Sequence, residues 1–312
     1  AEMMQTVDVG LALLVLALAI WTVAARDSFA AIVGFVAYGL LLALVWVRLQ
    51  GIDVALTEAA LGTGLTGAML IAAAIRLRKT ESQARTERPG VTMRLAAALV
   101  AGCVTSALAI AVFALPDPAP TLAPETAANI ATTGVGNPIT AVLLAFRAMD
   151  TLLEAIVVLF ALIGVWSLAP DAVWGGRPGS GRQGDSDGIL AYLARLLPPI
   201  GIIVGTYIFW IGADQPGGKF QGATLIAAMW LLVVMAGLAD TPRIGRTWLR
   251  VSLVAGPVVF IAVGAAGAAF AGAFLGYPEG LAKALIKVIE WALYPSLALT
   301  LALIVVGAPQ RK

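Results

Sequence analysis

Residues 139–167 read ITAVLLAFRAMDTLLEAIVVLFALIGVWS, an apolar run that is long enough to cross a bilayer. The run carries Arg147, Asp150 and Glu154 near its middle, and this spacing places the three within about 60° of arc on one side of a helix. One charge at the bilayer centre costs about 2.5–3.5 kcal/mol on insertion scales. Three charges on one face therefore predict that this face meets protein or water, and an ion pathway is the first hypothesis.

The composition of the whole chain indicates a membrane protein with several spans. Of its 312 residues, 60% are hydrophobic and 12% are charged, whereas about 25% are charged in ordinary soluble domains. The net charge of +2 is too small, and the basic residues too dispersed, to indicate nucleic-acid binding. Histidine is absent and Cys103 is the single cysteine, so the chain has no internal disulfide and no thiolate cluster for metal or redox chemistry. We expect no cofactor and no metal site.

Apolar runs of about 20 residues predict an all-α fold with about nine transmembrane helices. The first run is expected to be a retained helix, because the residues before it lack the basic region of a cleaved signal peptide. Longer loops are expected at 76–94, 116–138 and 169–195. The nine expected spans are 6–25, 29–47, 53–75, 95–115, 139–167, 196–211, 221–239, 251–274 and 284–306.

The distribution of Lys and Arg predicts the orientation of these spans. If the loop 76–94 lies in the cytoplasm, nine crossings place fifteen basic residues on the cytoplasmic side and three, Arg48, Lys219 and Lys283, on the other. This excess agrees with the positive-inside rule. It predicts an N-terminus outside the cell and a C-terminus in the cytoplasm.

Two acids lie in the first half of the third span. Asp53 is at its outer mouth, and Glu58 is about one and a half turns deeper with no basic residue within a turn. A carboxyl in that position must be protonated or paired with another helix, and proton relays use such groups. The alternative is a neutral Glu58 that hydrogen-bonds a neighbouring backbone group.

The third span also contains Gly62, Gly64 and Gly67 in the pattern G-x-G-x-x-G. No strand precedes this pattern and the segment is embedded in the membrane, so a dinucleotide site is rejected. Close packing of helices is the favoured interpretation. A local π-bulge that reorients Glu58 is the second.

In the span that contains the charged stripe, Arg147 can pair with Asp150 at i+3, which leaves Glu154 unmatched one turn further on. A buried structural ion pair that fixes how helices assemble is the alternative to a relay. That alternative accounts for the pair and leaves Glu154 unexplained, so the relay is favoured.

The ninth span carries Lys287 and Glu290 at i, i+3, close to Trp291 and Tyr294. These charges suit an ion relay, but Lys287 can also snorkel outward beside aromatic residues that mark the membrane interface. The two interpretations are equally favoured. The eighth span is rich in Gly and Ala, which predicts a packing surface for helices or partner subunits.

Between the sixth and seventh spans the sequence reads GADQPGGKFQGATL. Pro216 fixes one φ while Gly217 and Gly218 permit positive φ, so a sharp turn into the next helix is expected. The turn is interpreted either as a docking surface at the membrane face or as an ordinary hairpin between helices. The residues assigned to it are Asp214, Pro216, Gly217, Gly218, Phe220, Gln221 and Gly222.

Three of these stretches together resemble the membrane subunits of Mrp multisubunit sodium/proton antiporters. Asp53–Leu70 and Ile139–Leu159 resemble consecutive hydrogenase-type segments, D-like and E-like, of the large subunit's C-terminal region. Asp214–Ala228 resembles the Pro-Gly-Gly-x-Phe-Gln-Gly turn of the B subunit. The resemblance implies three modules, at residues 1–94, 95–189 and 190–312, in a bacterial or archaeal cell membrane.

The resemblance implies a subunit of a multisubunit Na+/H+ antiporter, a transporter component and not an enzyme, whose partners are other membrane subunits. It implies a place in the ion-translocating arm for Glu58, Arg147, Asp150 and Glu154, and subunit packing for the turn. The pathway residues expected overall also include Asp53, Lys287 and Glu290. The same modules occur in membrane-bound hydrogenases and complex I-like oxidoreductases, so a redox-driven complex stays open, as does a purely structural adaptor.

Overall fold

The computed structural model describes residues 2–84, 90–118, 120–179 and 188–309, and in them every regular element is helical. The first, second and fifth helices bury few or no residues, which is typical of spans that face lipid or partner subunits, whereas the last helix buries 12 of its 25. The elements are α1 (Glu2–Ala24), α2 (Ser28–Arg48), α3 (Ile52–Thr57), η1 (Glu58–Leu65), α4 (Thr66–Ala84), α5 (Val91–Phe113), α6 (Ala123–Thr133), α7 (Pro138–Ala141), η2 (Val142–Phe146), α8 (Ala148–Ser167), η3 (Asp171–Val173), α9 (Ile189–Ile211), α10 (Lys219–Met235), α11 (Thr247–Phe270) and α12 (Ala282–Val306).

The predicted all-α membrane architecture is confirmed. Within the described ranges, eight helices are long and apolar enough to cross a bilayer, with α3, η1 and α4 forming one continuous span. The seventh expected span is α10, whose 17 residues make it shorter than the others. These nine helices correspond one to one to the nine apolar runs of the sequence.

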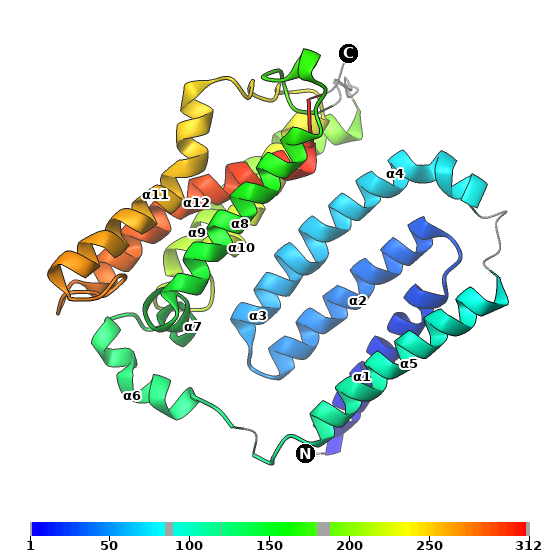
Figure 1. Ribbon diagram of the computed structural model, residues 1–312, viewed down its shortest axis with the longest axis horizontal. Helices are drawn as coiled ribbons and strands as arrows, with labels where there is room; N and C mark the ends of the chain where they lie inside the picture. The colour runs from blue at the N-terminus through cyan, green and yellow to red at the C-terminus, as the bar shows by residue number, and fades with distance from the viewer. Residues whose placement is uncertain (1, 85–89, 119, 180–187, 310–312) are drawn as a thin grey trace.

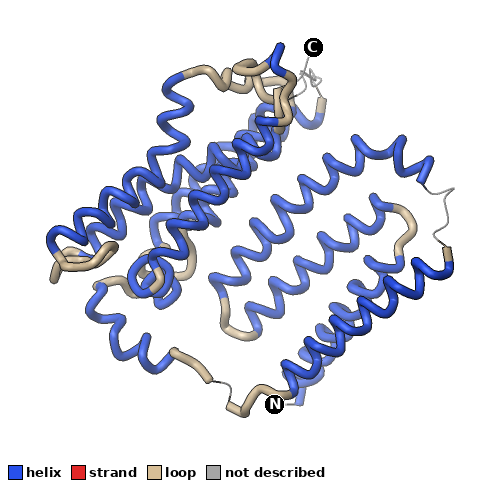
Figure 2. The backbone as a smooth tube through the Cα atoms, in the orientation of Figure 1, coloured by secondary structure: helices blue, strands red, loops and turns tan. Residues whose placement is uncertain are grey.

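The helices form two groups (Figures 1 and 2). In the first, α2 packs between α1 and the span made of α3, η1 and α4. In the second, α8 to α12 form a bundle in which α12 contacts α8, α10 and α11. Helix α10 joins the groups, because it contacts α9 and α12 on one side and η1 on the other. The residues of α5 are all partly or fully exposed.

Small residues set the closest helix contacts. A Cβ added to Gly222 of α10 would lie 2.5 Å from the carbonyl oxygen of Gly205 in α9, so the two backbones can touch only because side chains are absent there. The expected packing role of the eighth span is also seen, because a Cβ on Gly256 of α11 would lie 3.0 Å from the Cα of Leu293 in α12.

Three expected boundaries were wrong. The run 139–167 is not one helix, since the chain breaks at Arg147, whose φ and ψ of −131° and 38° are not helical. The expected loop 116–138 contains α6, which is bent by 85° from the helix that follows it. The sixth span starts at Ile189 instead of 196 and is therefore full length, with Pro198 and Pro199 inside it.

Two π-helical segments interrupt the spans that carry the predicted acids. The first, η1, begins at Glu58, as the second interpretation of the glycine pattern predicted. The second, η2, ends beside Arg147, whose amide N–H donates to the carbonyl of Val142 five residues earlier. The π turns shift the register of both helices immediately next to their charged residues.

A Gly222→Val substitution tests the contact between α9 and α10. Because its side chain would meet the Gly205 carbonyl and the ring of Tyr294, we expect the free energy of unfolding to fall by about 1–3 kcal/mol. Gly164→Ala in α8 is the control, since no atom lies within 4 Å of the added Cβ. Both are compared by thermal unfolding in detergent, and equal midpoints would contradict the assignment.

Candidate functional site

The carboxylate of Asp53 lies where three distant segments meet. Its Oδ1 accepts hydrogen bonds from the backbone N–H of Gly217, at 2.9 Å, and from Nδ2 of Asn137, at 3.2 Å. Asn137 also donates to the carbonyl of Gln215 and caps α7 through the amide N–H of Ile139. The start of α3, the start of α7 and the turn before α10 are therefore held together by one acid.

The turn itself has the predicted shape and contacts α3. Gly217 has φ of +147°, and a Cβ there would lie 2.4 Å from the carbonyl oxygen of Ile208, so no larger residue fits. Gln221 donates from Nε2 to the hydroxyl of Thr57 at 2.9 Å. The residues of this turn thus join the helices of the two groups within this chain.

A second group of side chains begins at the same end of the molecule. Asp214 accepts a 2.6 Å hydrogen bond from the ammonium of Lys283, and the two form an ion pair. This hydrogen bond from Lys283, together with a second one from the amide N–H of Gly136, holds the pKa of Asp214 below its usual range. Lys287, one turn further along α12, attracts the same carboxylate.

Further charged side chains follow Asp214 into the bundle. Lys283, Lys287 and Glu290 follow at i, i+4 and i+7, which puts them along one side of α12 over a rise of about 10 Å. Lys287 lies over the ring of Trp210, 5.6 Å from its centroid, and attracts Glu290. Glu290 is only 3% exposed. The aromatic partner of Lys287 is therefore Trp210 of α9 and not the expected neighbours Trp291 and Tyr294, and a relay role for Glu290 stays a prediction.

Lys219, the first residue of α10, is a buried lysine that attracts two acids on other helices. It is 4% exposed, and it attracts Glu290 of α12 and Glu154 of α8. A buried ammonium is costly without opposite charge, and the N-terminus of its own helix adds a positive dipole end. The two acids must therefore supply its stabilisation. We call Asp214, Lys283, Lys287, Glu290, Lys219 and Glu154 the charged row.

The predicted pair in the broken span is present and faces outward. Arg147 and Asp150 approach to 2.5 Å, and their side chains are 70% and 51% exposed. Glu154 is also exposed on this face of α8, and its opposite charge is Lys219, on another helix. Arg147 and Asp150 thus adjoin the end of the charged row on a face that this chain leaves uncovered.

Glu58 belongs to a separate place in the fold. Its carboxylate accepts a 3.4 Å hydrogen bond from Thr63 and lies against Gly62, whose missing side chain leaves the space for it. The close-packing interpretation of the glycines also holds at Gly67, where a Cβ would come within 2.7 Å of Val36 in α2. The charged row does not include Glu58.

Tyr277, in the loop between α11 and α12, closes the bundle near Glu290. Its hydroxyl donates a 2.5 Å hydrogen bond to the carbonyl of Leu144 in η2. Burial, together with the negative charge of Glu290, raises the pKa of Tyr277 to about 12. The adjacent carbonyl of Leu143 accepts from Thr151, so both carbonyls in this π turn have donors.

The sequence signals missed Lys219 and Asn137. Lys219 was expected in a loop outside the membrane, because it adjoins the Pro-Gly-Gly turn, and burial by α8 and α12 is a property of the tertiary structure alone. Asn137 did precede a proline at the start of an apolar run, which is an N-cap signal. That signal identifies a helix start and does not reveal the contact with Asp53.

An Asp53→Ala substitution tests the junction of the three segments. It leaves the Gly217 N–H and the Asn137 amide without their acceptor, so we expect a loss of about 1.5–3 kcal/mol in the free energy of unfolding. Glu125→Gln, on the exposed side of α6, is the control. Denaturant unfolding of the purified chain measures both, and a variant as stable as the control would remove Asp53 from this role.

A Tyr277→Phe substitution tests the loop bond. We expect a loss of about 1 kcal/mol at neutral pH, since the Leu144 carbonyl loses its donor. An ordinary tyrosine ionises near pH 10 and Tyr277 near 12, so its stabilisation is complete below pH 10 and disappears as the pH rises toward 12. The difference in the free energy of unfolding between wild type and variant should shrink between pH 10 and 12. The exposed Tyr192→Phe is the control and should leave the free energy of unfolding unchanged at both pH values.

Two family models match the chain. Residues 13–79 match the model for MbhD, a subunit of MBH, and residues 189–309 match the domain related to the MnhB subunit of Na+/H+ antiporter. The first match contains Asp53 and Glu58, and the second contains the turn, Lys219, Lys287 and Glu290. Neither covers Ile139–Leu159. No curated protein matches the chain.

Two solved structures have a similar fold. A chain of the Mrp complex from Dietzia sp. superposes on 97% of this chain with a TM-score of 0.73 at 23% identity, and this chain spans about a third of its length (35%). The archaeal membrane-bound sulfane sulfur reductase, described as a respiratory membrane complex, has a chain that superposes on 69% of this one with a TM-score of 0.55 at 23% identity, and 99% of that chain is covered.

The resemblance of Asp53–Leu70 and Asp214–Ala228 to two subunit families is therefore confirmed by the matches that contain them. The chain is thus a membrane protein in which one polypeptide carries a segment that matches MbhD and a segment that matches the domain related to the MnhB subunit of Na+/H+ antiporter.

Proposed function

We propose that the chain is a membrane subunit of a multisubunit monovalent cation (Na+)/proton antiporter, where it contributes to the ion path and to subunit assembly. It is a transporter component and not an enzyme. The observation that carries the proposal is the charged row, whose three acids and three bases run from the loop residue Asp214 to Glu154 in α8. Such groups inside spans are costly and are kept for ion movement.

Lys219 is the central group of the proposed path. It is buried and attracts both Glu290 and Glu154, so in this proposal a proton passes among these three side chains. Moving a proton from the ammonium to either carboxylate removes one charge of each sign and leaves the net charge of the cluster unchanged. A cation that approaches Glu154 weakens the attraction between that acid and Lys219, which favours transfer of the proton toward Glu290.

The outward face of α8 is the proposed contact with a partner subunit. Arg147, Asp150 and Glu154 are exposed there in this chain. Charges at membrane depth are not expected to face lipid. We therefore expect another membrane subunit, or a water-filled path between the subunits, to cover this face and to continue the charged row.

The proposed orientation places the N-terminus outside a bacterial or archaeal cell membrane and the C-terminus in the cytoplasm. This orientation is supported by the position of the loops assigned to the cytoplasm, which lie together at one end of the bundle. The amide of Ile244 donates to the Gly176 carbonyl, and Arg76 lies beside Gly307. We also propose three modules, 1–94, 95–189 and 190–312. Glu58 belongs to the first module and is proposed as a separate relay.

A redox-driven ion pump is the second candidate. The structural similarity to a chain of the sulfane sulfur reductase favours it, since that complex is respiratory. In that case the same helices would move ions, and other chains would carry the redox centres. A structural adaptor is the third candidate. That role does not explain why the charged residues Lys219 and Glu290 are buried.

The test is ion exchange by the assembled complex with Glu290→Gln, Lys219→Met or Glu154→Gln. We expect each variant to assemble and to lower exchange by about 10²-fold, the usual scale for loss of a proton-transfer group. Glu279→Gln, which changes an acid in the loop before α12, is the control and should retain full exchange.

Three results would contradict parts of this proposal. Full exchange by all three variants would remove the charged row from the path. Loss of assembly with normal exchange per complex would favour the adaptor. Co-purification with subunits that absorb as flavin or iron–sulfur centres would favour the redox-driven pump over the antiporter.

A further inference from the structure

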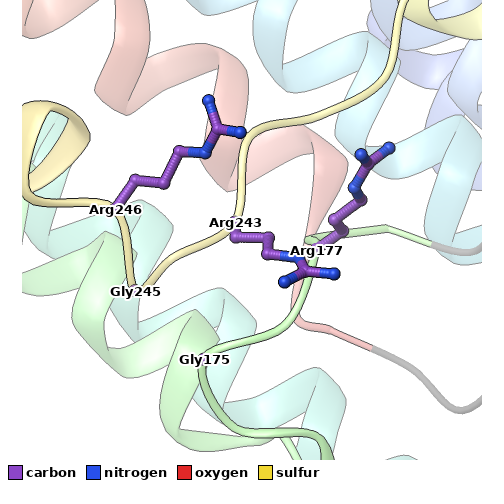
Figure 3. A pocket seen from close by; sticks show the side chains of 5 residues that line it. All are labelled: Gly175, Arg177, Arg243, Gly245 and Arg246. Carbon is purple, nitrogen blue, oxygen red and sulfur yellow. The ribbon is translucent and has the colours of Figure 1, made fainter.

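Three arginines line an open hollow of about 620 Å³ at the end of the bundle that lies opposite Asp53. Arg177 comes from the loop after α8, and Arg243 and Arg246 come from the loop before α11 (Figure 3). The remaining lining residues are Gly175 and Gly245, which have no side chain beyond the backbone. The wall of the hollow is therefore formed by guanidinium groups and peptide groups.

Backbone hydrogen bonds fix the loops around this hollow. The amide N–H of Ile244 donates to the carbonyl of Gly176 at 3.0 Å, and the hydroxyl of Thr241 donates to the carbonyl of Pro178 at 2.8 Å. Ile244 is buried, and its carbonyl accepts from the guanidinium of Arg250. The arginines thus extend from two loops that hydrogen bonds hold against each other.

The hollow carries an excess of positive charge. Arg177 forms an ion pair with Asp240, which offsets one of the three charges. Arg243 and Arg246 bring the local balance to about two positive charges by this count. Arg246 also occupies the N-cap position of α11, where no side chain caps the helix and the dipole is positive. The site favours an anion with several acceptor oxygens.

An apolar surface adjoins the arginines. A neighbouring hollow of about 280 Å³ shares all three arginines, contains Asp240, and has an apolar wall formed by Trp230, Trp248 and Leu299. Trp248 is half exposed in the first turn of α11. Tryptophan at the end of a membrane span marks the level of the lipid headgroups. The arginines and this apolar wall therefore meet at that level.

We propose that Arg177, Arg243 and Arg246 form a binding site for the phosphate of an anionic phospholipid, with an acyl chain against Trp248 and Leu299. Arginine is suited to phosphate, because its planar group donates two parallel hydrogen bonds. Free inorganic phosphate can accept the same hydrogen bonds, but it has no apolar group that could contact the adjoining apolar wall. This site shares no residue with the charged row, so the experiment on lipid binding tests it separately from the proposed function.

The experiment titrates the purified full chain with detergent-solubilised phosphatidylglycerol or phosphatidylcholine and counts bound lipid by native mass spectrometry. We expect preference for phosphatidylglycerol, and an affinity about 25-fold lower in Arg243→Gln/Arg246→Gln, since each basic residue contributes a factor of about 5 at an anionic surface. Arg26→Gln/Arg94→Gln removes the same charge outside the hollow and should stay within about twofold of wild type.

A second variant separates binding from folding. Arg243→Lys/Arg246→Lys keeps the charge and should retain most of the preference for phosphatidylglycerol, with a loss of only a few-fold. Equal losses in the Gln variant and in its control would overturn the site. Absence of any preference for phosphatidylglycerol would do the same, and displacement of this lipid by an equal concentration of inorganic phosphate would show a free-anion site instead.

Discussion

The hydrogen bonds of one carboxylate, that of Asp53, hold the two helix groups in register. Its acceptor oxygen takes the Gly217 N–H and the Asn137 amide, so residues more than 80 positions apart in the sequence share one atom. The start of α10 is thereby tied to the start of α3, while α9 and α12 pack along the rest of the helix.

That anchor determines where Lys219 lies. Only Gly218 separates it from Gly217, whose N–H is bound to Asp53, so the anchored turn fixes where the lysine enters the bundle and attracts Glu290 and Glu154. The packing turn therefore sets the position of one member of the charged row, Lys219. A change in the turn is expected to move the ammonium relative to both acids, and so to affect assembly and ion movement together.

The spans, the Arg147–Asp150 pair, the sharp turn and the π segment at Glu58 could be predicted, because each depends on residues close in sequence. The rest depends on distant contacts. The burial of Lys219 needs α8 and α12, and a lysine beside Pro-Gly-Gly gives no sign of them. The break at Arg147 falls inside an unbroken apolar run, and Tyr277, which donates to the segment before that break, is more than 130 residues away.

The two π segments connect these observations. A π turn leaves carbonyls without their usual helical donors, and in η2 the carbonyls of Leu143 and Leu144 are satisfied by Thr151 and Tyr277. The irregular backbone is thus stabilised inside the protein, which is the condition under which it is tolerated at membrane depth. It also gives Arg147 a non-helical backbone, so the regular geometry of α8 places Asp150 and Glu154 but does not place Arg147.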